Sequence, residues 1–227
     1  STPGQKKFYV VNNVLETFTS KVGQYVEIMN LEEFGNALFI DHEIQVAEKD
    51  EKIYSSTFFK SSYTLSKKCN NVAIIGGGDG GVARECLENN VNYIDWYELD
   101  PEIVESCYRH LPKVCSKVKK SNSVNTLWGD AFESIKSIED SKYDKIFVDL
   151  NDDQYCIDLA RKNMKGLKRI LKPGGVITAQ VGSMDKKPKQ VNNWCNVLEK
   201  SFGNVAITGT HIPSFDCNWN FASSIMK

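Results

Sequence analysis

The 227-residue sequence has no apolar run that approaches 18 residues, which excludes an evident membrane-spanning helix. Residues 1–7 lack the apolar core of a signal peptide. Ser1 is not a natural start residue, which leaves room for an upstream segment. The chain also has no internal repeat and no low-complexity segment. These absences predict a globular cytoplasmic protein with no membrane partner.

Neither sign of charge is in excess. The chain carries 28 basic and 29 acidic side chains, a net charge of −1, with no block of five or six like charges. A protein that coats nucleic acid usually carries a basic surface, so we expect no nucleic-acid partner. The hydrophobic fraction of 41% is ordinary for a folded protein and excludes a disordered or fibrous chain.

The seven cysteines and three histidines form no metal-binding motif. The cysteines are scattered and odd in number, with no Cys-x-x-Cys and no paired histidines. Structural metal sites and disulfide frameworks need closely spaced ligands. We therefore expect reduced, mostly buried thiols and no metal.

Two regions of the chain differ in rhythm. Residues 8–47 show short strands separated by turns, whereas buried strands alternate with helices further along. That alternation is typical of a parallel sheet covered on both faces. The last two strands, near 205–211 and 220–226, have no helix between them, which predicts an antiparallel final strand. We predict an α/β protein, with a small N-terminal β domain over 1–58 and a Rossmann-like, doubly wound, methyltransferase-type domain over 59–227.

Several start signals place the helices. Asp50 is a candidate N-cap, and Pro101 suits a first helical position. A helix that begins near Tyr155 has an apolar face made up of Ile157, Ala160, Met164, Leu167 and Ile170. The other expected elements are strands at 24–30, 36–40, 44–47, 72–75, 93–98, 124–127, 145–149 and 176–181, and helices after 76–81 and at 190–202.

A glycine loop, Gly76-Gly-Gly78-Asp79-Gly80-Gly81, follows a strand and opens a helix. Its G-x-G-x-x-G pattern lets the backbone approach a nucleotide-like ligand, and a dinucleotide enzyme would show the same pattern. Asp79 argues against that alternative because a carboxylate repels a pyrophosphate. The loop favours a cationic ligand such as a sulfonium nucleoside.

Two further acidic residues follow neighbouring strands. Glu98 ends the strand after the glycine loop, where it can accept hydrogen bonds from ribose hydroxyls. Asp130 follows Gly129 at the end of the next strand and is placed to accept from an adenine amino group. For Glu98 the alternative interpretation is a solvated strand end.

A third acidic motif, Asp149-Leu-Asn-Asp152-Asp153, follows a central strand. The carboxyl ends of parallel strands face the crevice where ligands bind, so Asp79, Asp149 and Asp152 are expected to form an acidic pocket. Such a pocket suits a primary ammonium, and one carboxylate is positioned to take a proton from an attacking amine. The alternative is that Asp152 and Asp153 only cap the helix that follows.

These motifs together resemble the spermidine/spermine synthase family of polyamine aminopropyltransferases. The Asp149-Leu form and His211-Ile-Pro-Ser-Phe215 look most like the thermospermine synthase branch. The stretches that match the family are Gln24, Phe34-Gly-Asn36, Ile44-Gln-Val-Ala-Glu-Lys-Asp50, Tyr54, the glycine loop, Glu98-Leu-Asp100, Gly129-Asp130, Asp149-x-x-Asp152 and Ile212-Pro-Ser-Phe215. The likeness to the thermospermine branch also includes Gln180-Val-Gly182, Trp219 and Ala222-Ser223.

The resemblance implies a Rossmann-like fold, a homodimer, and transfer of the aminopropyl group of decarboxylated S-adenosylmethionine to a small-molecule polyamine, putrescine or spermidine, without a metal. The nucleoside co-substrate would contact Gln24, Gly76, Gly78, Asp79, Gly81, Glu98 and Asp130. The catalytic group would comprise Tyr54, Asp149 and Asp152. The polyamine channel would be lined by Gln180, Phe215 and Trp219.

Four positions depart from the family pattern. Ser55-Ser56 replaces His or Gln followed by Glu, Asp153 stands where the acidic motif usually ends in Pro, and Phe215 replaces the usual Tyr. Two alternatives stay open. The first is an S-adenosylmethionine-dependent N-methyltransferase of a small amine, whose cofactor carboxylate Asp79 and Asp152 would repel. The second is a catalytically silent homologue.

Overall fold

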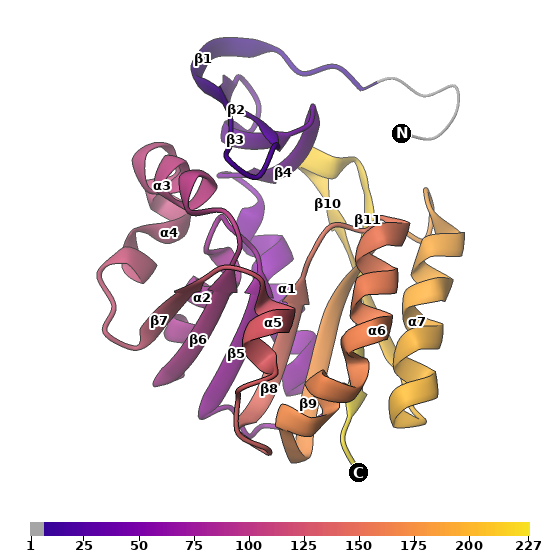
Figure 1. Cartoon of the computed structure of the whole chain (residues 1–227). Helices are drawn as coiled ribbons and strands as arrows, with labels where there is room; N and C mark the ends of the chain where they lie inside the picture. The colour runs from indigo at the N-terminus through magenta and orange to yellow at the C-terminus, as the bar shows by residue number, and fades with distance from the viewer. Residues whose placement is uncertain (1–6) are drawn as a thin grey trace.

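The computed structural model describes residues 7–227, and its chain forms two sheets that stack end to end (Figure 1). The smaller is a four-stranded antiparallel meander in the order β1-β2-β3-β4. Its strands are β1 (Val11–Thr19), β2 (Tyr25–Leu31), β3 (Gly35–Ile40) and β4 (Glu43–Ala47). The expected N-terminal β region is confirmed.

The larger sheet has seven strands in the order β10-β11-β9-β8-β5-β6-β7. Only β11 runs against its neighbours, so the expected antiparallel final strand is confirmed. The strands are β5 (Asn71–Gly76), β6 (Tyr93–Glu98), β7 (Val124–Trp128), β8 (Tyr143–Asp149), β9 (Leu171–Gly182), β10 (Ala206–Ile212) and β11 (Cys217–Ile225).

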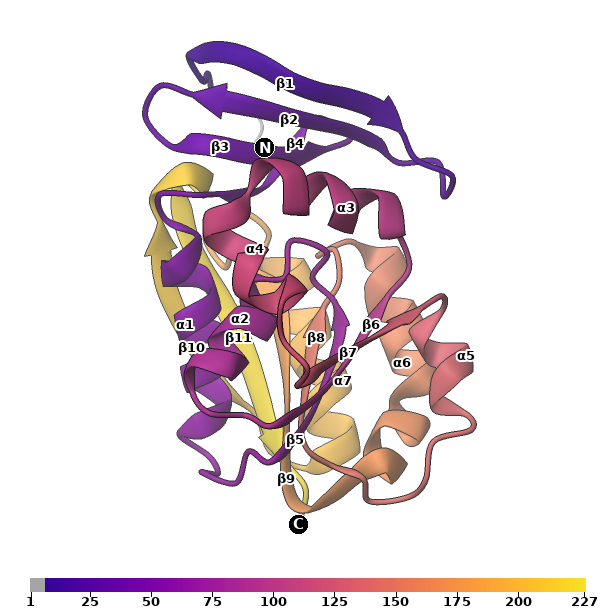
Figure 2. The same cartoon turned by 90° about the vertical axis from the view of Figure 1, so that its left-hand side faces the viewer.

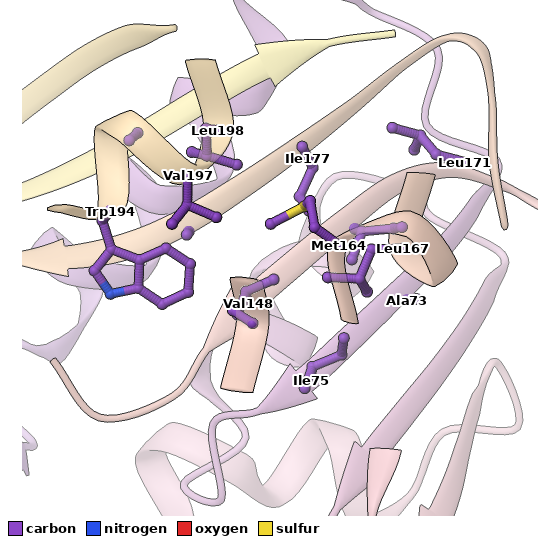
Figure 3. Packing of buried hydrophobic residues seen from close by; sticks show 14 of the residues in the cluster. Ala73, Ile75, Val148, Met164, Leu167, Leu171, Ile177, Trp194, Val197 and Leu198 are labelled. Atoms are coloured by element: carbon purple, nitrogen blue, oxygen red, sulfur yellow. The ribbon is translucent and has the colours of Figure 1, made fainter. Parts of the chain in front are cut away.

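Helices cover both faces of the large sheet. The helical segments are α1 (Glu51–Tyr63), α2 (Gly81–Glu88), α3 (Pro101–His110), α4 (Pro112–Lys119), α5 (Ala131–Ile135), α6 (Gln154–Ile170), α7 (Pro188–Phe202) and the 3₁₀ turn η1 (Pro213–Phe215). One core lies between the sheet and α5, α6 and α7, and a second lies under α1, α2 and α4. Figure 3 shows the first core, where Met164 and Leu167 of α6 and Trp194 of α7 meet Val148 and Ile177. This arrangement is the doubly wound, Rossmann-like fold.

Three sequence expectations are revised by the structure. The α4 and α5 helices were not expected, and β9 begins at Leu171 rather than at Val176. Asp50 does precede α1, but its carboxylate makes no cap there. It accepts instead from the backbone N–H of Ser214 at 2.6 Å, because η1 packs against the start of the helix.

Helix α1 joins the two sheets and crosses the predicted domain boundary at residues 58 and 59. Phe58 and Phe59 pack into the core of the large sheet, and the rings of Phe58 and Phe221 stack at 4.7 Å. The boundary stays a prediction, and a division between β4 and α1 fits this packing better.

The small sheet covers the carboxyl end of the large sheet (Figures 1 and 2). Apolar residues of β2 and β3, including Val26, Ile28 and Leu38, pack against α3 and α4. The glycine loop, Glu98 and Asp149 all follow or end strands of the large sheet at this covered edge. The fold therefore places the predicted ligand residues between the two sheets.

Candidate active site

The centre of the candidate site is the register between β5 and β8, where Gly76 pairs with Asp149. The chain runs outward from β5 through β6 to β7 and then returns to β8 on the other side, which is the switch point where open α/β sheets bind ligands. Gly76 has a φ of +80°, and a Cβ there would stand 2.4 Å from the carbonyl oxygen of Asp149. Only glycine allows this close approach.

Asp149 is held by a tyrosine from a distant helix. The Tyr54 hydroxyl of α1 donates to Asp149 Oδ1 at 2.5 Å. Burial raises the pKa of Asp149 to about 6, partly offset by this hydrogen bond. Burial and the adjacent Asp149 raise the pKa of Tyr54 well above its usual value, so the phenol keeps its proton. The Tyr54 hydroxyl thus stays a hydrogen-bond donor to Oδ1 of Asp149, and Oδ2 of the same carboxylate is not bound by Tyr54.

Asp79 and Asp152 are the other two carboxylates of the predicted acidic pocket. Asp79 lines one recess together with Tyr54, and the charges of both carboxylates add to the raised pKa of Tyr54. Burial, followed by the charges of Asp149 and Glu51, raises the pKa of Asp79 well above its usual value. Asp79 Oδ1 also accepts from the Gly81 N–H at 2.7 Å. Asp79 and Asp149 are thus brought together beside Tyr54, and their mutual repulsion favours a cation between them.

Glu98 joins this group from β6. It is 8% exposed, which overturns the interpretation of a solvated strand end. Its Oε1 accepts from the Asp100 N–H at 3.0 Å, and burial raises its pKa to about 7. A Cβ on Gly78 would stand 3.5 Å from Glu98 Oε2. The carboxylate therefore lies against the glycine loop, as a ligand of a loop-bound group would.

Asp130 and Gln24 lie further out. Asp130 is exposed, and one of its oxygens caps α5 by accepting from the Phe132 N–H at 2.8 Å. Gln24 follows the turn between β1 and β2 in the other sheet. The neighbouring Lys21 N–H donates to Glu102 at the start of α3 at 2.6 Å, so this turn lies over the end of β6.

The three residues predicted to line a polyamine channel form one connected wall. The Trp219 indole N–H donates to Gln180 Oε1 at 3.1 Å, and the Gln180 amide donates to the Leu150 carbonyl. The Phe215 ring lies edge-on to Trp219 at 4.9 Å and to Tyr54 at 6.2 Å. The wall therefore adjoins the acidic pocket through Tyr54.

Asp152 and Asp153 have different partners. Asp153 caps α6 by accepting from the Cys156 N–H at 2.8 Å, which confirms the capping interpretation for this residue. Asp152 instead lies against Gly182 at the end of β9, where a Cβ would stand 2.8 Å from its Oδ2. Its Oδ2 also pairs with Lys187 Nζ at 3.2 Å.

A buried ionic network behind Asp79 was not expected from the sequence. The Arg84 guanidinium of α2 pairs with both oxygens of Glu51, and Glu85 lies 3.7 Å away. The two serines that depart from the family pattern face this network, Ser55 donating to Glu51 and Ser56 to Glu85 at 3.0 Å. In the sequence, Glu51, Arg84 and Glu85 are charged residues on two expected helices, and nothing in their spacing predicts that they pair.

One recess opens beside the pocket, lined in part by Tyr54, Asp79 and Phe215. Gln45 of β4 also lines this recess. It lies in the Ile44–Asp50 stretch that resembles the family, but it was not among the predicted site residues. Within residues 7–227, no cluster of three or more His, Cys, Asp or Glu side chains suits a metal ion. None of the described helices is both long and apolar enough to cross a membrane.

The fold and the pocket define a Rossmann-like α/β protein with an acidic binding site at the carboxyl edge of its sheet. The family model described as "Spermine/spermidine synthase domain" matches residues 51–227. The chain belongs to the spermine/spermidine synthase family, whose members are polyamine aminopropyltransferases.

Curated relatives carry the same description. A polyamine aminopropyltransferase of Korarchaeum cryptofilum is 29% identical over 97% of this chain and 69% of its own length. One from Prochlorococcus marinus (strain NATL1A) is 32% identical over 88% of this chain and 72% of its own length.

Solved structures share the fold. A spermidine synthase in complex with the transition state analogue AdoDATO superposes with a TM-score of 0.91 and 19% identity, covering 99% of this chain and 77% of its own. The Thermotoga maritima spermidine synthase gives a TM-score of 0.88 and 19% identity over 99% and 76%. These likenesses confirm the predicted fold class.

Proposed function

We propose that this chain transfers the aminopropyl group of decarboxylated S-adenosylmethionine to putrescine or spermidine and releases methylthioadenosine. The observation that carries the proposal is the Tyr54–Asp149 pair inside an acidic pocket at the glycine loop. Family membership supports it, as does the AdoDATO complex of the similar spermidine synthase.

The pocket suits a cationic co-substrate. Gly76, Gly78 and Gly81 would let the backbone approach the nucleoside, Glu98 would accept from its ribose, and Gln24 and Asp130 would hold it from outside. Asp79 and Asp152 would receive the aminopropyl ammonium. Ordinary S-adenosylmethionine carries a carboxylate at that position, and like charges disfavour it there. This contrast favours the decarboxylated compound over the methyltransferase alternative.

The acceptor amine must lose a proton, because a free primary amine is mostly protonated near pH 7 and the lone pair of nitrogen is the nucleophile. Asp149 would take that proton on the oxygen that Tyr54 does not bind. The amine nitrogen then bonds to the methylene carbon next to sulfur, the carbon–sulfur bond breaks, and its electron pair makes sulfur a neutral thioether. Positioning supplies much of the remaining catalysis.

The channel wall of Gln180, Phe215 and Trp219 would hold the distal part of the amine by apolar and cation–π contact. We further propose that spermidine yields thermospermine, because Phe215 and the surrounding motif resemble that branch. A homodimer is also proposed, from the resemblance alone.

The test is a product assay. The purified protein is incubated with decarboxylated or ordinary S-adenosylmethionine and with putrescine or spermidine, and the products are identified by mass. Chromatography separates spermine from thermospermine, which have equal mass. We expect an aminopropylated amine and methylthioadenosine only with the decarboxylated compound. A methylated amine with the ordinary one would instead establish the methyltransferase, and nucleoside binding without any turnover would establish the silent homologue.

A further inference from the structure

The side chain of Lys187 forms an ion pair with the carboxylate of Asp152. Lys187 Nζ lies 3.2 Å from Asp152 Oδ2, with the two side chains 35% and 16% exposed. Lys187 ends the loop between β9 and α7 and is the residue before Pro188, the first residue of α7. The ion pair therefore connects this loop to the segment that precedes α6.

The loop that carries Lys187 is itself held in place. The Lys187 N–H donates to the Ser183 carbonyl at 2.8 Å. The neighbouring Lys186 Nζ donates to the Phe215 carbonyl of η1 at 2.9 Å, and Asp185 accepts from Asn218 at 3.0 Å. The Lys187 ammonium is thus presented to Asp152 by a loop anchored to the same wall that borders the pocket.

The chemistry of this ammonium matches that of the proposed ligands. Lysine places a primary ammonium at the end of a four-carbon stem, as an aliphatic diamine does. Asp152 lies against Gly182, two residues beyond Gln180 of the channel wall, so the pair stands at the border of the predicted ligand site. A ligand ammonium directed to Asp152 would find the charge of that carboxylate already balanced by the ammonium of Lys187.

We propose that Lys187 is a resident counter-ion of Asp152, which the ammonium of the bound ligand must displace. The proposal rests on the proposed function, in which Asp152 receives an ammonium. Because both side chains keep contact with solvent, the pair is a weak one that a better-placed ligand can replace. Lys187 would thereby set the affinity of the site for cationic ligands and spare Asp152 an unpaired charge when the site is empty.

The test compares two ligands that differ by the ammonium. Calorimetric titrations with decarboxylated S-adenosylmethionine and with uncharged methylthioadenosine are run on the wild-type protein, Lys187→Met and Lys187→Gln. We expect both variants to bind the decarboxylated compound roughly 3- to 10-fold more tightly, the scale of a partly exposed ion pair. Their affinity for methylthioadenosine should stay unchanged.

Lys189→Met is the matched control. Lys189 is exposed, two residues further along the chain, so this variant removes the same charge without removing the pair. An equal gain in affinity in Lys189→Met would assign the effect to net charge and overturn the proposal. Unchanged or weaker binding of the decarboxylated compound by Lys187→Met would also overturn it.

A double substitution separates this proposal from the proposed function. In an Asp152→Asn background, Lys187→Met should give no further gain, and a persisting gain would overturn the pairing. If Lys187→Met tightens binding but the product assay shows no turnover, the proposed function fails and the counter-ion role stands. If neither protein binds the decarboxylated compound while both bind methylthioadenosine, both proposals fail.

Discussion

At the scale of single residues, the two oxygens of Asp149 have different surroundings. Oδ1 accepts from Tyr54 at 2.5 Å, whereas Oδ2 lies over Gly77, where a Cβ would stand 2.7 Å away. The absence of a side chain at Gly77 leaves Oδ2 accessible from the glycine loop. One oxygen is thus fixed by the tyrosine, and the other is free to receive a proton.

Asp149→Asn tests this assignment by removing the proton acceptor and keeping the shape. We expect the turnover number to fall by about 10² or more, because an amide cannot take a proton from the amine. The measurement is product formation at saturating substrates. Asp153→Asn removes the same charge from the exposed cap of α6 and should leave turnover close to that of the wild type. Near-normal turnover in Asp149→Asn would remove Asp149 from the base role.

The same variant should be more stable at neutral pH. The folded-state pKa of Asp149 is raised from 3.8 to about 6, so the folded state binds the proton more tightly than the unfolded state does. The ionised carboxylate therefore lowers the free energy of unfolding above about pH 6, and this cost disappears below about pH 4. Asp149→Asn should gain on the order of 1 kcal/mol at pH 7.5 and little at pH 4, by urea unfolding.

The pH dependence of the wild-type enzyme gives an independent test. As pH falls through about 6, Asp149 is protonated in the free enzyme and loses its capacity as a base. We expect kcat/KM to decline on the acid side with a midpoint near pH 6, approaching tenfold per pH unit below it. The residual activity of Asp149→Asn should lack this limb. A limb that survives in the variant belongs to another group, such as Glu98.

Residues at strand ends were predictable, because the end of a parallel strand fixes where the next side chain lies. That rule predicts Asp79, Glu98 and Asp149 at one edge of the sheet, where the structure has them. The partners of Glu51 and Asp152 were not predictable: Arg84 lies 33 positions from Glu51 along the chain, and Lys187 lies 35 positions from Asp152. Only tertiary packing brings such pairs together.

At the scale of elements, α6 shows that the spacing of apolar residues along a long helix predicts its buried face. Its predicted apolar face, Ile157, Ala160, Met164, Leu167 and Ile170, is buried in full. The helices α4 and α5 were missed because eight and five residues offer too few periodic positions to reveal a face. Because α5 was not predicted, Asp130 was interpreted only as an adenine ligand, whereas its side chain also caps α5.

Leu167→Ala tests the contribution of this buried face. Leu167 is 0% exposed, so the substitution removes buried apolar contacts and leaves a cavity between α6 and the sheet. We expect the free energy of unfolding to fall by about 2 to 5 kcal/mol. Urea unfolding followed by circular dichroism measures it. Lys165→Ala, on the exposed side of the same helix, should change stability by less than about 0.5 kcal/mol, and an equal loss there would contradict the interpretation.

At the scale of the whole molecule, a net charge of −1 conceals an uneven distribution. The acidic pocket gathers carboxylates at or after the ends of β5, β6 and β8 at one edge, so a matching excess of basic side chains lies elsewhere on the molecule. Composition predicts no nucleic-acid partner, but it carries no information about where the charges lie in the fold. Composition also does not predict where the small sheet lies. Its position over α3 depends on tertiary contacts, in which Val26 and Ile28 pack against that helix.

The antiparallel strand β11 has a consequence for the order in which the protein becomes competent on the ribosome. Tyr54 rests against Phe221, with ring centroids 5.1 Å apart, and η1 immediately precedes β11. A growing chain therefore releases its glycine loop and its acidic strand ends long before the strand that completes their wall. Because β11 lies between β9 and β10 in the sheet, we infer that a nascent chain that stops before Cys217 leaves β10 without its strand partner and Tyr54 without Phe221, so its pocket stays unfinished.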